Sequence, residues 1–360
     1  MEAPQHILGP VGLTSAISLR QPLRWWLLLL LALAAIGAGC VQTPPQRYEF
    51  RRVLMGVQTQ IILHAEAREE ARDAAAAAFA EIARLEQLMS DYRPSSQLSA
   101  INAAAGASVP ADSSMIEILE SASEVSRLTE GAFDATVGPA VLLWRESRRS
   151  GAPSSAAVVA EAVSLVDWRG VQVSREAGTV RLARRGMKLD LGGIAKGFAA
   201  EKALETLRAR GMASALVALS GDVAVGDPPP GKGGWRVAIA NERSGTILGT
   251  VMVANVCVST SGDSEQFVEI AGVRYAHIAD PRTAMGVVGG VPVTVIAPRG
   301  ADADSIATGA FVLGSARTRT LALPAGVTII LHGSGEPEFF GEGGRAELGW
   351  TPRLVGGAGP

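Results

Sequence analysis

Apolar residues recur at helical spacing along much of the chain. The longest such stretch runs over residues 67–89, where alanines and larger aliphatic residues return every three or four positions. The same spacing predicts shorter helices over 113–130, 136–146, 154–163, 193–210 and 302–313. Asp112 or Ser113 can cap the first of these, and Gly131, Gly211 and Gly314 stand where helices are expected to end.

Alternation of apolar and polar residues predicts strands in the intervening segments. Residues 48–65 are predicted to form a strand or a hairpin, and residues 171–182 a hairpin that turns at 176–178. Further single strands are predicted over 215–225, 235–240, 246–258, 266–277 and 291–296. Strands and helices are clustered and do not alternate regularly, which favours an α+β fold with mixed or antiparallel sheet and packed helices.

The N-terminal segment has the pattern of an export signal. Arg20 and Arg24 precede an apolar run over 25–36, which has the length of a signal-peptide core and is too short for a membrane span. Small residues follow and lead to Cys40, an arrangement that resembles the bacterial lipoprotein signal, although Gly37 stands where an aliphatic residue is usual. A plain cleaved signal and an uncleaved anchor are the alternatives. We expect an exported protein on the periplasmic side of the cell membrane, lipid-anchored through Cys40.

These patterns divide the chain into four parts. Residues 1–40 are predicted to be the export signal, 41–50 a tether, 51–350 one folded domain and 351–360 a flexible tail. The chain has only two cysteines, so lipidation of Cys40 leaves Cys257 without a disulfide partner. Cys257 lies in an apolar run and is predicted to be a core residue.

Charge excludes one class of function. The 33 basic residues nearly balance the 35 acidic ones, and no stripe of Lys and Arg is present. The electrostatic signature of a nucleic-acid-binding protein is therefore missing.

Residues 188–197 combine a strand end, paired glycines and a helix start. Gly192 and Gly193 would let a ligand approach the backbone, and the N–H groups at the start of the next helix would favour a phosphate. Lys196 in the first helical turn is unfavourable for the helix and favourable for a bound anion. The spacing matches neither a Walker A motif nor a Rossmann motif, so it does not identify the nucleotide.

Asp304 and Thr308 are one helical turn apart and can face the same ligand. A carboxylate and a hydroxyl are suitable ligands for a hard cation such as Mg²⁺. Asp302 can instead serve only as the cap of this helix.

Three further residues have both a functional and a structural interpretation. Tyr92, in a loop beside Arg93, can stack on a planar ligand or plug its own loop. Asp134 can contact a ligand or cap the following helix. His277, near the end of a predicted strand, can be catalytic, although a single histidine there is more often structural.

Eight segments, in this order, resemble the ApbE family of FAD:protein FMN transferases between about Arg51 and Leu313. They are Met55-Gly56, SDYRPSSQLSAIN, GAFDATVGP, LDLGGIAKGFAAEKA, WRVAIANE, VSTSGD, RYAHIADPRT and DADSIATGAFVLG. The resemblance implies a T-fold-like α+β architecture with an FAD site between sheet and helices. One departure is Ala284-Met285, where the family commonly has glycine after the threonine.

The resemblance also implies roles for individual residues. The carbonyl of Gly193, with Asp304 and Thr308, would hold Mg²⁺, and His277 would be catalytic. FAD would be lined by Met55, Tyr92, Ala132, Phe133, Asp134, Asp190, Lys196 and Ile278.

The implied reaction is Mg²⁺-dependent transfer of FMN from FAD to a Thr or Ser hydroxyl of a target flavoprotein, with release of AMP. Implied acceptors are periplasm-facing subunits of membrane redox complexes, such as Na⁺-translocating quinone reductases and Rnf complexes. Two alternatives remain: an FAD pyrophosphatase that gives FMN and AMP, and a non-enzymatic flavin-carrying lipoprotein that donates electrons. Acceptor segments of the family typically have an Asp-Gly or Ser-Gly step before the flavinylated Thr. The chain has no Asp-Gly step, and none of its Ser-Gly steps has a convincing acceptor context, which argues against self-flavinylation.

Overall fold

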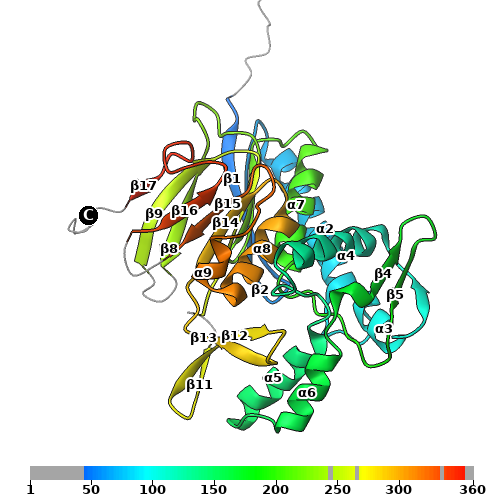
Figure 1. The fold of residues 1–360 in the computed structure, drawn as a ribbon. Coiled ribbons are helices and arrows are strands. Elements are labelled where there is room, and N and C mark those ends of the chain that lie inside the picture. The colour runs from blue at the N-terminus through cyan, green and yellow to red at the C-terminus, as the bar shows by residue number, and fades with distance from the viewer. Residues whose placement is uncertain (1–43, 242–245, 264–266, 333–335, 353–360) are drawn as a thin grey trace, which may run out of the picture. The chain divides into compact units, whose positions relative to one another are not determined.

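A central antiparallel sheet organises the molecule (Figure 1). The computed structural model describes residues 44–241, 246–263, 267–332 and 336–352. The predicted export signal and Cys40 lie outside the described residues. The strands of the sheet follow the order β1 (Gln46–Leu54), β2 (Val57–Ala65), β6 (Ala215–Leu219), β7 (Asp222–Val225), β10 (Val256–Ser261), β14 (Val293–Ala297), β15 (Thr328–Leu331) and β16 (Glu338–Gly341).

Helices cover one face of this sheet. They are α2 (Arg68–Met89), α7 (Ala195–Arg208), α8 (Gly300–Leu313) and α4 (Ser113–Leu128), and they pack on one another and on the strands. Their apolar faces form one large core with the alternate residues of the sheet, including Ile82, Phe198, Phe311 and Val217. The buried Cys257 belongs to this core, as its apolar surroundings predicted.

A second, three-stranded sheet covers the opposite face. It has the order β17 (Thr351–Pro352), β9 (Thr246–Val253) and β8 (Trp235–Asn241). Trp235 and Val251 from this sheet pack against Val258 and Ile330 of the central sheet in a separate apolar cluster. The order of layers is therefore helices, central sheet and small sheet, an α+β arrangement as predicted.

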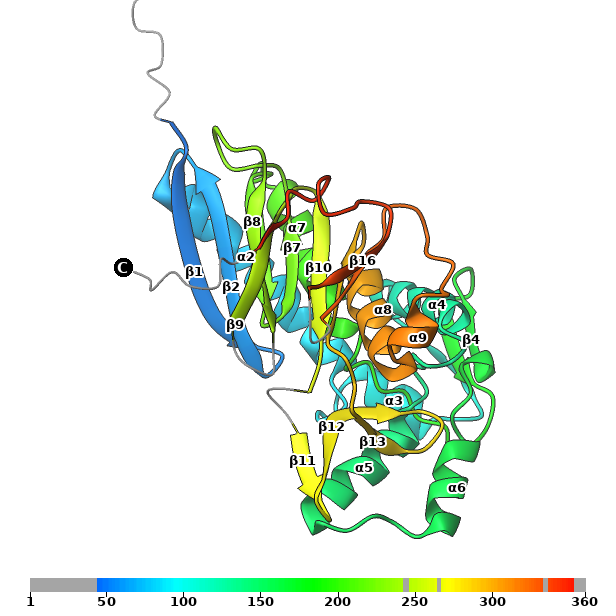
Figure 2. The same cartoon turned by 60° about the vertical axis from the view of Figure 1, so that its left-hand side comes forward.

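Two smaller groups of elements complete the fold (Figure 2). In the first, α5 (Gly138–Ser150) and α6 (Ala156–Ser164) lie beside a sheet of β11 (Phe267–Ile270), β12 (Val273–Asp280) and β13 (Met285–Val288). Trp144 of α5 donates to the carbonyl of Ala276 at 3.1 Å and so ties this helix to β12. The remaining elements are α3 (Gln97–Ala103), β3 (Ser108–Pro110), η1 (Trp168–Gly170), β4 (Val171–Ser174), β5 (Thr179–Leu182) and α9 (Ser315–Thr318).

Three segments predicted as single strands are pairs of strands. Residues 215–225 form β6 and β7, 246–258 form β9 and the first half of β10, and 266–277 form β11 and most of β12. Their turns contain Ser220, Asn255 and Ala271, all with φ between 50° and 56°. Serine and alanine are poor signals for a left-handed turn, but glycine follows both, and asparagine is itself a turn residue. The three reversals were missed because each lies inside a longer stretch of apolar residues.

Helix boundaries also differ from the prediction. Helix α7 begins at Ala195, not at Gly193, and α8 begins at Gly300, not at Asp302. Asp302 therefore lies inside the first turn of α8, where it pairs with Arg299 at 2.8 Å. No helix among the described residues is long and apolar enough to cross a bilayer.

Two turns have backbone conformations that matter for the resemblance. Met55 and Gly56 form the two-residue turn between β1 and β2, with φ of 51° and 74°, as in a type I′ hairpin. Ala284 has φ of 51° and is fully buried. Glycine adopts a positive φ without steric cost, which is a physical reason why glycine would suit position 284.

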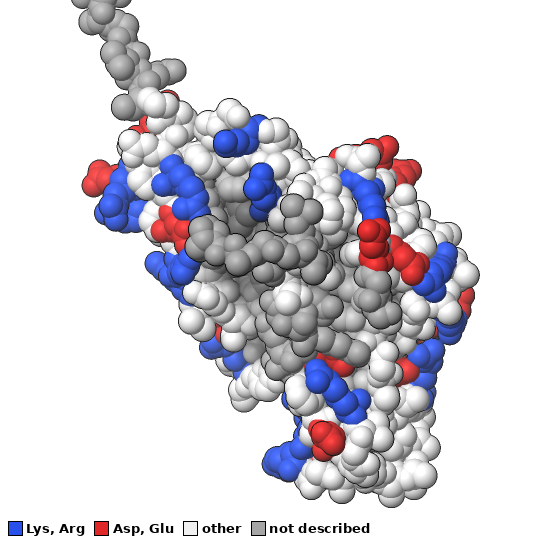
Figure 3. Space-filling model, turned by 90° about the vertical axis from the view of Figure 1, so that its left-hand side faces the viewer, with Lys and Arg blue, Asp and Glu red and all other residues white. Residues whose placement is uncertain are grey.

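Charged side chains of both signs are interspersed on the face shown in Figure 3, in keeping with the balanced composition.

Candidate functional site

A cavity of about 340 Å³ lies at the junction of the central sheet, the start of α7, α8 and the α5–β12 group. Every site residue predicted from the sequence lines this cavity except Met55. The lining members of that set are Tyr92, Ala132, Phe133, Asp134, Asp190, Gly193, Lys196, His277, Ile278, Asp304 and Thr308.

Met55 lies in the adjacent hairpin turn. Its backbone N–H donates to Glu86 at 3.0 Å, and the next strand places Val57 in the cavity wall. The structure therefore brings this hairpin to the cavity through Val57, while Met55 itself is outside the lining.

Oxygen atoms gather where α8 faces the turn before α7. The Thr308 hydroxyl lies 3.5 Å from the Gly193 carbonyl and 3.3 Å from the Ser261 hydroxyl. A Cβ at Gly193 would lie 2.9 Å from Thr308 Oγ1, so only glycine permits this approach. Asp304, one turn before Thr308, adds a buried carboxylate.

These oxygen atoms are of the types that bind a small hard cation. They are one carboxylate, hydroxyls and a backbone carbonyl, which Mg²⁺ accepts while it keeps water and substrate phosphates as its other ligands. Among the described residues, no group of three or more His, Cys, Asp or Glu side chains could hold a metal ion. A cation at Asp304 would therefore depend on neutral oxygen atoms of the protein and on water or substrate oxygens to complete its ligands.

Lys196 stands between two carboxylates in the cavity. Its ammonium forms an ion pair with Asp222 and lies 4.0 Å from Asp304 Oδ2. Burial and the nearby Asp222 raise the pKa of Asp304 to about 7, and Lys196 opposes this rise. When both carboxylates are ionised, this buried cluster has two negative charges and one positive charge, and its net charge is therefore negative.

Asp222 was not singled out from the sequence. It is 2% exposed and follows directly on the Ser220-Gly221 turn, which also lines the cavity. The prediction placed it in the middle of a single strand, so the reversal that aims this carboxylate into the cavity was missed. A Ser-Gly-Asp step interrupting an apolar run was the available signal.

The backbone at the start of α7 differs from the expectation of N–H groups open to a phosphate. The N–H of Gly197 donates to Asp304 Oδ2 at 3.1 Å, and the N–H of Lys196 also hydrogen-bonds this carboxylate. Asp304 thus satisfies two of the donors that a helix leaves unpaired at its first turn. The paired glycines and the Lys196 ammonium remain beside the cavity.

Asp134 accepts hydrogen bonds from its own loop and from the start of η1. Its carboxylate accepts from the N–H and the hydroxyl of Thr136, both at 2.7 Å, and from the N–H of Trp168 at 2.9 Å. Desolvation by burial nevertheless raises its pKa. It does not cap α5, whose N-cap residue is Val137.

Tyr92 and Asp190 are connected through Arg145, which sequence reasoning did not single out. The Tyr92 side chain is exposed, and the Arg145 guanidinium lies 4.7 Å from the centre of its ring. Arg145 also pairs with Asp91 and, at 3.2 Å, with Asp190. Burial raises the pKa of Asp190, and Arg145 opposes that rise.

One face of α5, together with its N-cap residue, lines the cavity. Its members are Val137, Val141, Trp144, Arg145 and Arg148. Their spacing is that of a single helical face, apolar at the start and cationic at the end. Because this helix was predicted only from its apolar period, the chemical role of its arginines was not visible in the sequence.

His277 and Ile278 reach the cavity from β12. Pairing of β12 with β13 shifts register between Tyr275 and Ala279, so the strand is irregular where these two residues face the cavity. The His277 side chain is exposed. An exposed imidazole that lines the cavity can accept a proton from a group that enters from solvent.

Comparison with known proteins gives consistent matches. Residues 55–331 match the model of the ApbE family. A protein of Treponema pallidum (strain Nichols) named FAD:protein FMN transferase is 34% identical over 313 residues, which cover 81% of this chain and 86% of that protein.

Solved structures have the same fold. The apbe protein of Thermotoga maritima superposes with a TM-score of 0.75 at 28% identity, covering 82% of this chain and 97% of that chain. The apo form of flavinyl transferase ApbE of Pseudomonas stutzeri superposes with a TM-score of 0.74 at 25% identity, covering 85% and 98%.

Proposed function

Because the chain belongs to the ApbE family, we propose that it is an FAD:protein FMN transferase that uses Mg²⁺ to move FMN from FAD to a Thr or Ser hydroxyl of a target protein. AMP is the second product. The observation that carries the proposal is that one cavity brings together Lys196, the oxygen donors around Asp304, and His277.

In the proposed step, the acceptor hydroxyl attacks the FMN-side phosphorus of the FAD pyrophosphate. A new bond forms between this phosphorus and the hydroxyl oxygen, and the bond to the bridging oxygen breaks. AMP leaves with the bridging oxygen. His277 accepts the hydroxyl proton, a contribution of roughly 10²–10⁴-fold for a positioned base.

The remaining cavity residues bind and orient FAD. The Lys196 ammonium and the Gly192-Gly193 backbone face the pyrophosphate, while Tyr92 offers an exposed ring on which a planar base or flavin can stack. Asp304, Thr308 and the Gly193 carbonyl would hold Mg²⁺. When bound, Mg²⁺ would neutralise charge that develops on the pyrophosphate, an effect worth several kcal/mol.

We place this reaction outside the cytoplasm. The export pattern before Cys40 supports a lipid-anchored enzyme on the periplasmic side of the membrane. Its acceptors would then be periplasm-facing subunits of membrane redox complexes, which present their flavin-carrying Thr in the same compartment.

The test is to incubate the purified domain with FAD, Mg²⁺ and a candidate acceptor domain, and then to measure the acceptor's mass and the free nucleotides. Transfer adds the mass of one FMN minus water to the acceptor and releases one AMP for each acceptor modified. Formation of FMN and AMP without acceptor modification would indicate a pyrophosphatase. If FAD stays intact while bound, the chain is a flavin carrier and the proposal fails.

A further inference from the structure

Among the described residues, two carboxylates lie within 4.0 Å of the Lys196 ammonium, and the Asp222 carboxylate is the closer one. The ammonium contacts Asp222 directly, whereas Asp304 Oδ2 lies 4.0 Å away. Both carboxylates are at least 96% buried, so neither can be neutralised well by bulk water. A small rotation of the lysine side chain would bring the ammonium onto Asp304.

The orientation of Asp222 is set by its neighbours. Asp222 and Ser259 are opposite each other in the antiparallel pair β7–β10. The Ser259 hydroxyl donates to Oδ1 of Asp222, and this leaves Oδ2 directed at Lys196. The carboxylate is therefore held by the sheet and is independent of the helix α8 that carries Asp304.

This geometry has a consequence for the cation. An ammonium and a divalent cation compete for the same carboxylate oxygens, because both are attracted to the single negative charge of Asp304. The closer partner for Lys196 is a carboxylate that belongs to neither the predicted metal ligands nor their helix.

We propose that Asp222 is a positioning residue that holds the Lys196 ammonium away from Asp304, so that the Asp304 carboxylate can bind the divalent cation. The inference rests on the proposed Mg²⁺-dependent transfer. Removal of the Asp222 charge leaves Asp304 as the nearest carboxylate to Lys196 among the described residues, and the lysine then acts as a tethered competitor of the metal.

The experiment measures Mn²⁺ binding by the loss of the free-ion EPR signal, without nucleotide, so that the phosphates of FAD contribute no ligands. Mn²⁺ shares the preference of Mg²⁺ for oxygen ligands. Asp222→Asn should weaken Mn²⁺ binding about 10–100-fold, the range typical for loss of a residue that supports a metal ligand. Asp227→Asn is the matched control, since it removes an exposed carboxylate outside the cavity.

A double-mutant cycle separates the lysine effect from simple loss of charge. Lys196→Met should improve Mn²⁺ binding much more in the Asp222→Asn background than in the wild type, because only there does the lysine sit on Asp304. Equal gains in both backgrounds would mean that Asp222 acts by its charge alone. That result would overturn the proposal.

Two further readouts keep the outcomes distinct. Asp222→Asn retains an acceptor for the Ser259 hydroxyl, and thermal unfolding checks that it folds. If Asp222→Asn does not fold, Ser259→Ala is the second variant, because it removes only the hydrogen bond that orients Asp222. Ser259→Ala should also weaken Mn²⁺ binding, to a smaller extent. A wild type that binds no Mn²⁺ would overturn both the metal site and this inference, whereas a wild type and Asp222→Asn that bind equally would overturn this inference alone.

Discussion

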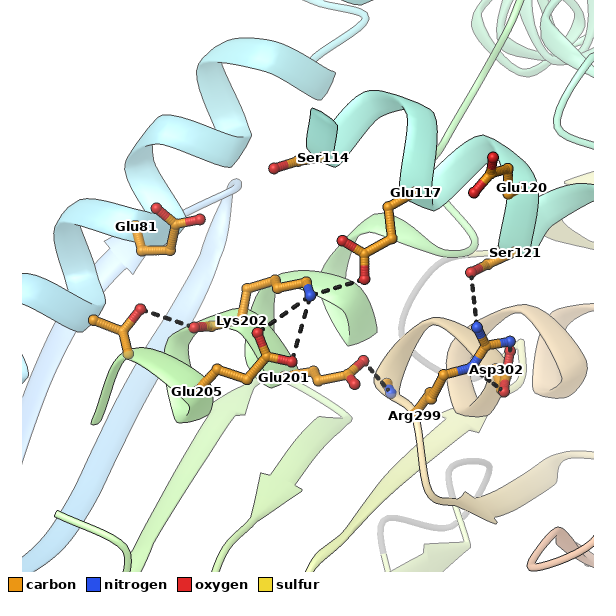
Figure 4. A network of polar contacts seen from close by, with 12 residues as sticks. Glu81, Ser114, Glu117, Glu120, Ser121, Glu201, Lys202, Glu205, Arg299 and Asp302 are labelled. Carbon is orange, nitrogen blue, oxygen red and sulfur yellow. Dashed lines mark hydrogen bonds and ion pairs between the residues drawn. The ribbon is translucent and has the colours of Figure 1, made fainter. Parts of the chain in front are cut away.

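Gly197 donates its backbone N–H to the Asp304 carboxylate at 3.1 Å, across the crossing of α7 and α8. In the other direction, Glu201 of α7 accepts the N–H of Gly300, the first residue of α8, at 2.8 Å (Figure 4). Neither helix has a side-chain cap from its own N-cap residue. Each helix is thus capped by a carboxylate of the other, and the candidate cation ligand Asp304 is part of this exchange.

The first prediction concerns the space at this crossing. A Cβ at Gly197 would lie 2.2 Å from the Gly300 carbonyl oxygen, which is backbone and cannot rotate away. We expect Gly197→Ala to lower the free energy of unfolding by about 1–3 kcal/mol, as overpacking does, and to weaken Mn²⁺ binding by displacing Asp304. Denaturant unfolding and EPR measure the two effects.

Gly233→Ala is the matched control, because nothing lies within 4 Å of a Cβ at that position and its φ is not in the left-handed region. Equal stability of Gly197→Ala and Gly233→Ala would contradict the close packing of α7 on α8 at Gly197.

The second prediction separates the charge of Asp304 from its capping role. Asp304→Asn keeps an oxygen that can accept from Gly197, so we expect the protein to fold. Because the negative charge is lost, Mn²⁺ binding and FMN transfer should both disappear. Asp302→Asn, which removes the charge of a carboxylate that pairs with Arg299 and does not line the cavity, should retain both. Transfer by purified Asp304→Asn, or by the wild type in EDTA, would argue against the metal assignment.

Asp304→Asn should also change how the free energy of unfolding of the metal-free protein depends on pH. The pKa of Asp304 is raised to about 7, from about 3.9 expected for the unfolded chain. A raised carboxyl pKa contributes stability at low pH that is lost as the pH rises from about 4 to about 7. The wild type should therefore lose stability relative to Asp304→Asn over this window. A constant difference in the free energy of unfolding would contradict the raised pKa.

The third prediction concerns His277. A proton acceptor matters in the transition state more than in the bound substrate, so His277→Ala should lower the transfer rate by roughly 10²–10⁴-fold and leave FAD affinity largely unchanged. Single-turnover transfer and flavin fluorescence titration measure these quantities. His64→Ala, a histidine on β2 that does not line the cavity, is the control. Loss of FAD affinity with normal turnover at saturating FAD would make His277 a binding residue.

The fourth prediction is an acid-sensitive contribution from His332. This side chain is 4% exposed, its Nδ1 has no hydrogen-bond partner among the described residues, and burial lowers its pKa to about 4. The unfolded chain binds this proton below about pH 6.5, so the stability that the neutral ring contributes above that pH is lost as the pH falls to about 4. The loss is of the order of 3 kcal/mol.

His332→Gln should accordingly flatten the fall in the free energy of unfolding between pH 6.5 and 4, measured by denaturant titration at several pH values. The same slope in both proteins would contradict the lowered pKa of His332 in the folded state.

The fifth prediction concerns attachment to the membrane, through a residue outside the described part of the chain. If Cys40 is lipidated, Cys40→Ser should leave the signal uncleaved or release the protein from the membrane fraction, as cell fractionation and mass spectrometry would show. Cys257→Ala, which removes the other cysteine, should leave attachment unchanged. A wild type that keeps an intact leader would count against a lipoprotein.

Some features of the protein could be predicted from the sequence alone because they depend on local chemistry. The helical period of 67–89, the turn at 176–178 and the spacing of Asp304 and Thr308 are short-range patterns. The structure has a helix over Arg68–Met89 and a hairpin that turns at 176–178. The order of the family motifs likewise predicted which residues would share a site, and all but Met55 line one cavity.

Other features required the tertiary structure, because they depend on residues distant in sequence. Asp222 reaches the cavity only because β6 and β7 reverse at Ser220, and its orientation comes from Ser259 on a neighbouring strand. Likewise, Arg145 forms its ion pairs with Asp91 and Asp190 only because the fold packs α5 beside them. Local pattern determined which elements form and which residue types carry chemistry, whereas strand pairing and helix crossing decided which charges face one another, because buried electrostatic partners are selected by packing across the whole domain.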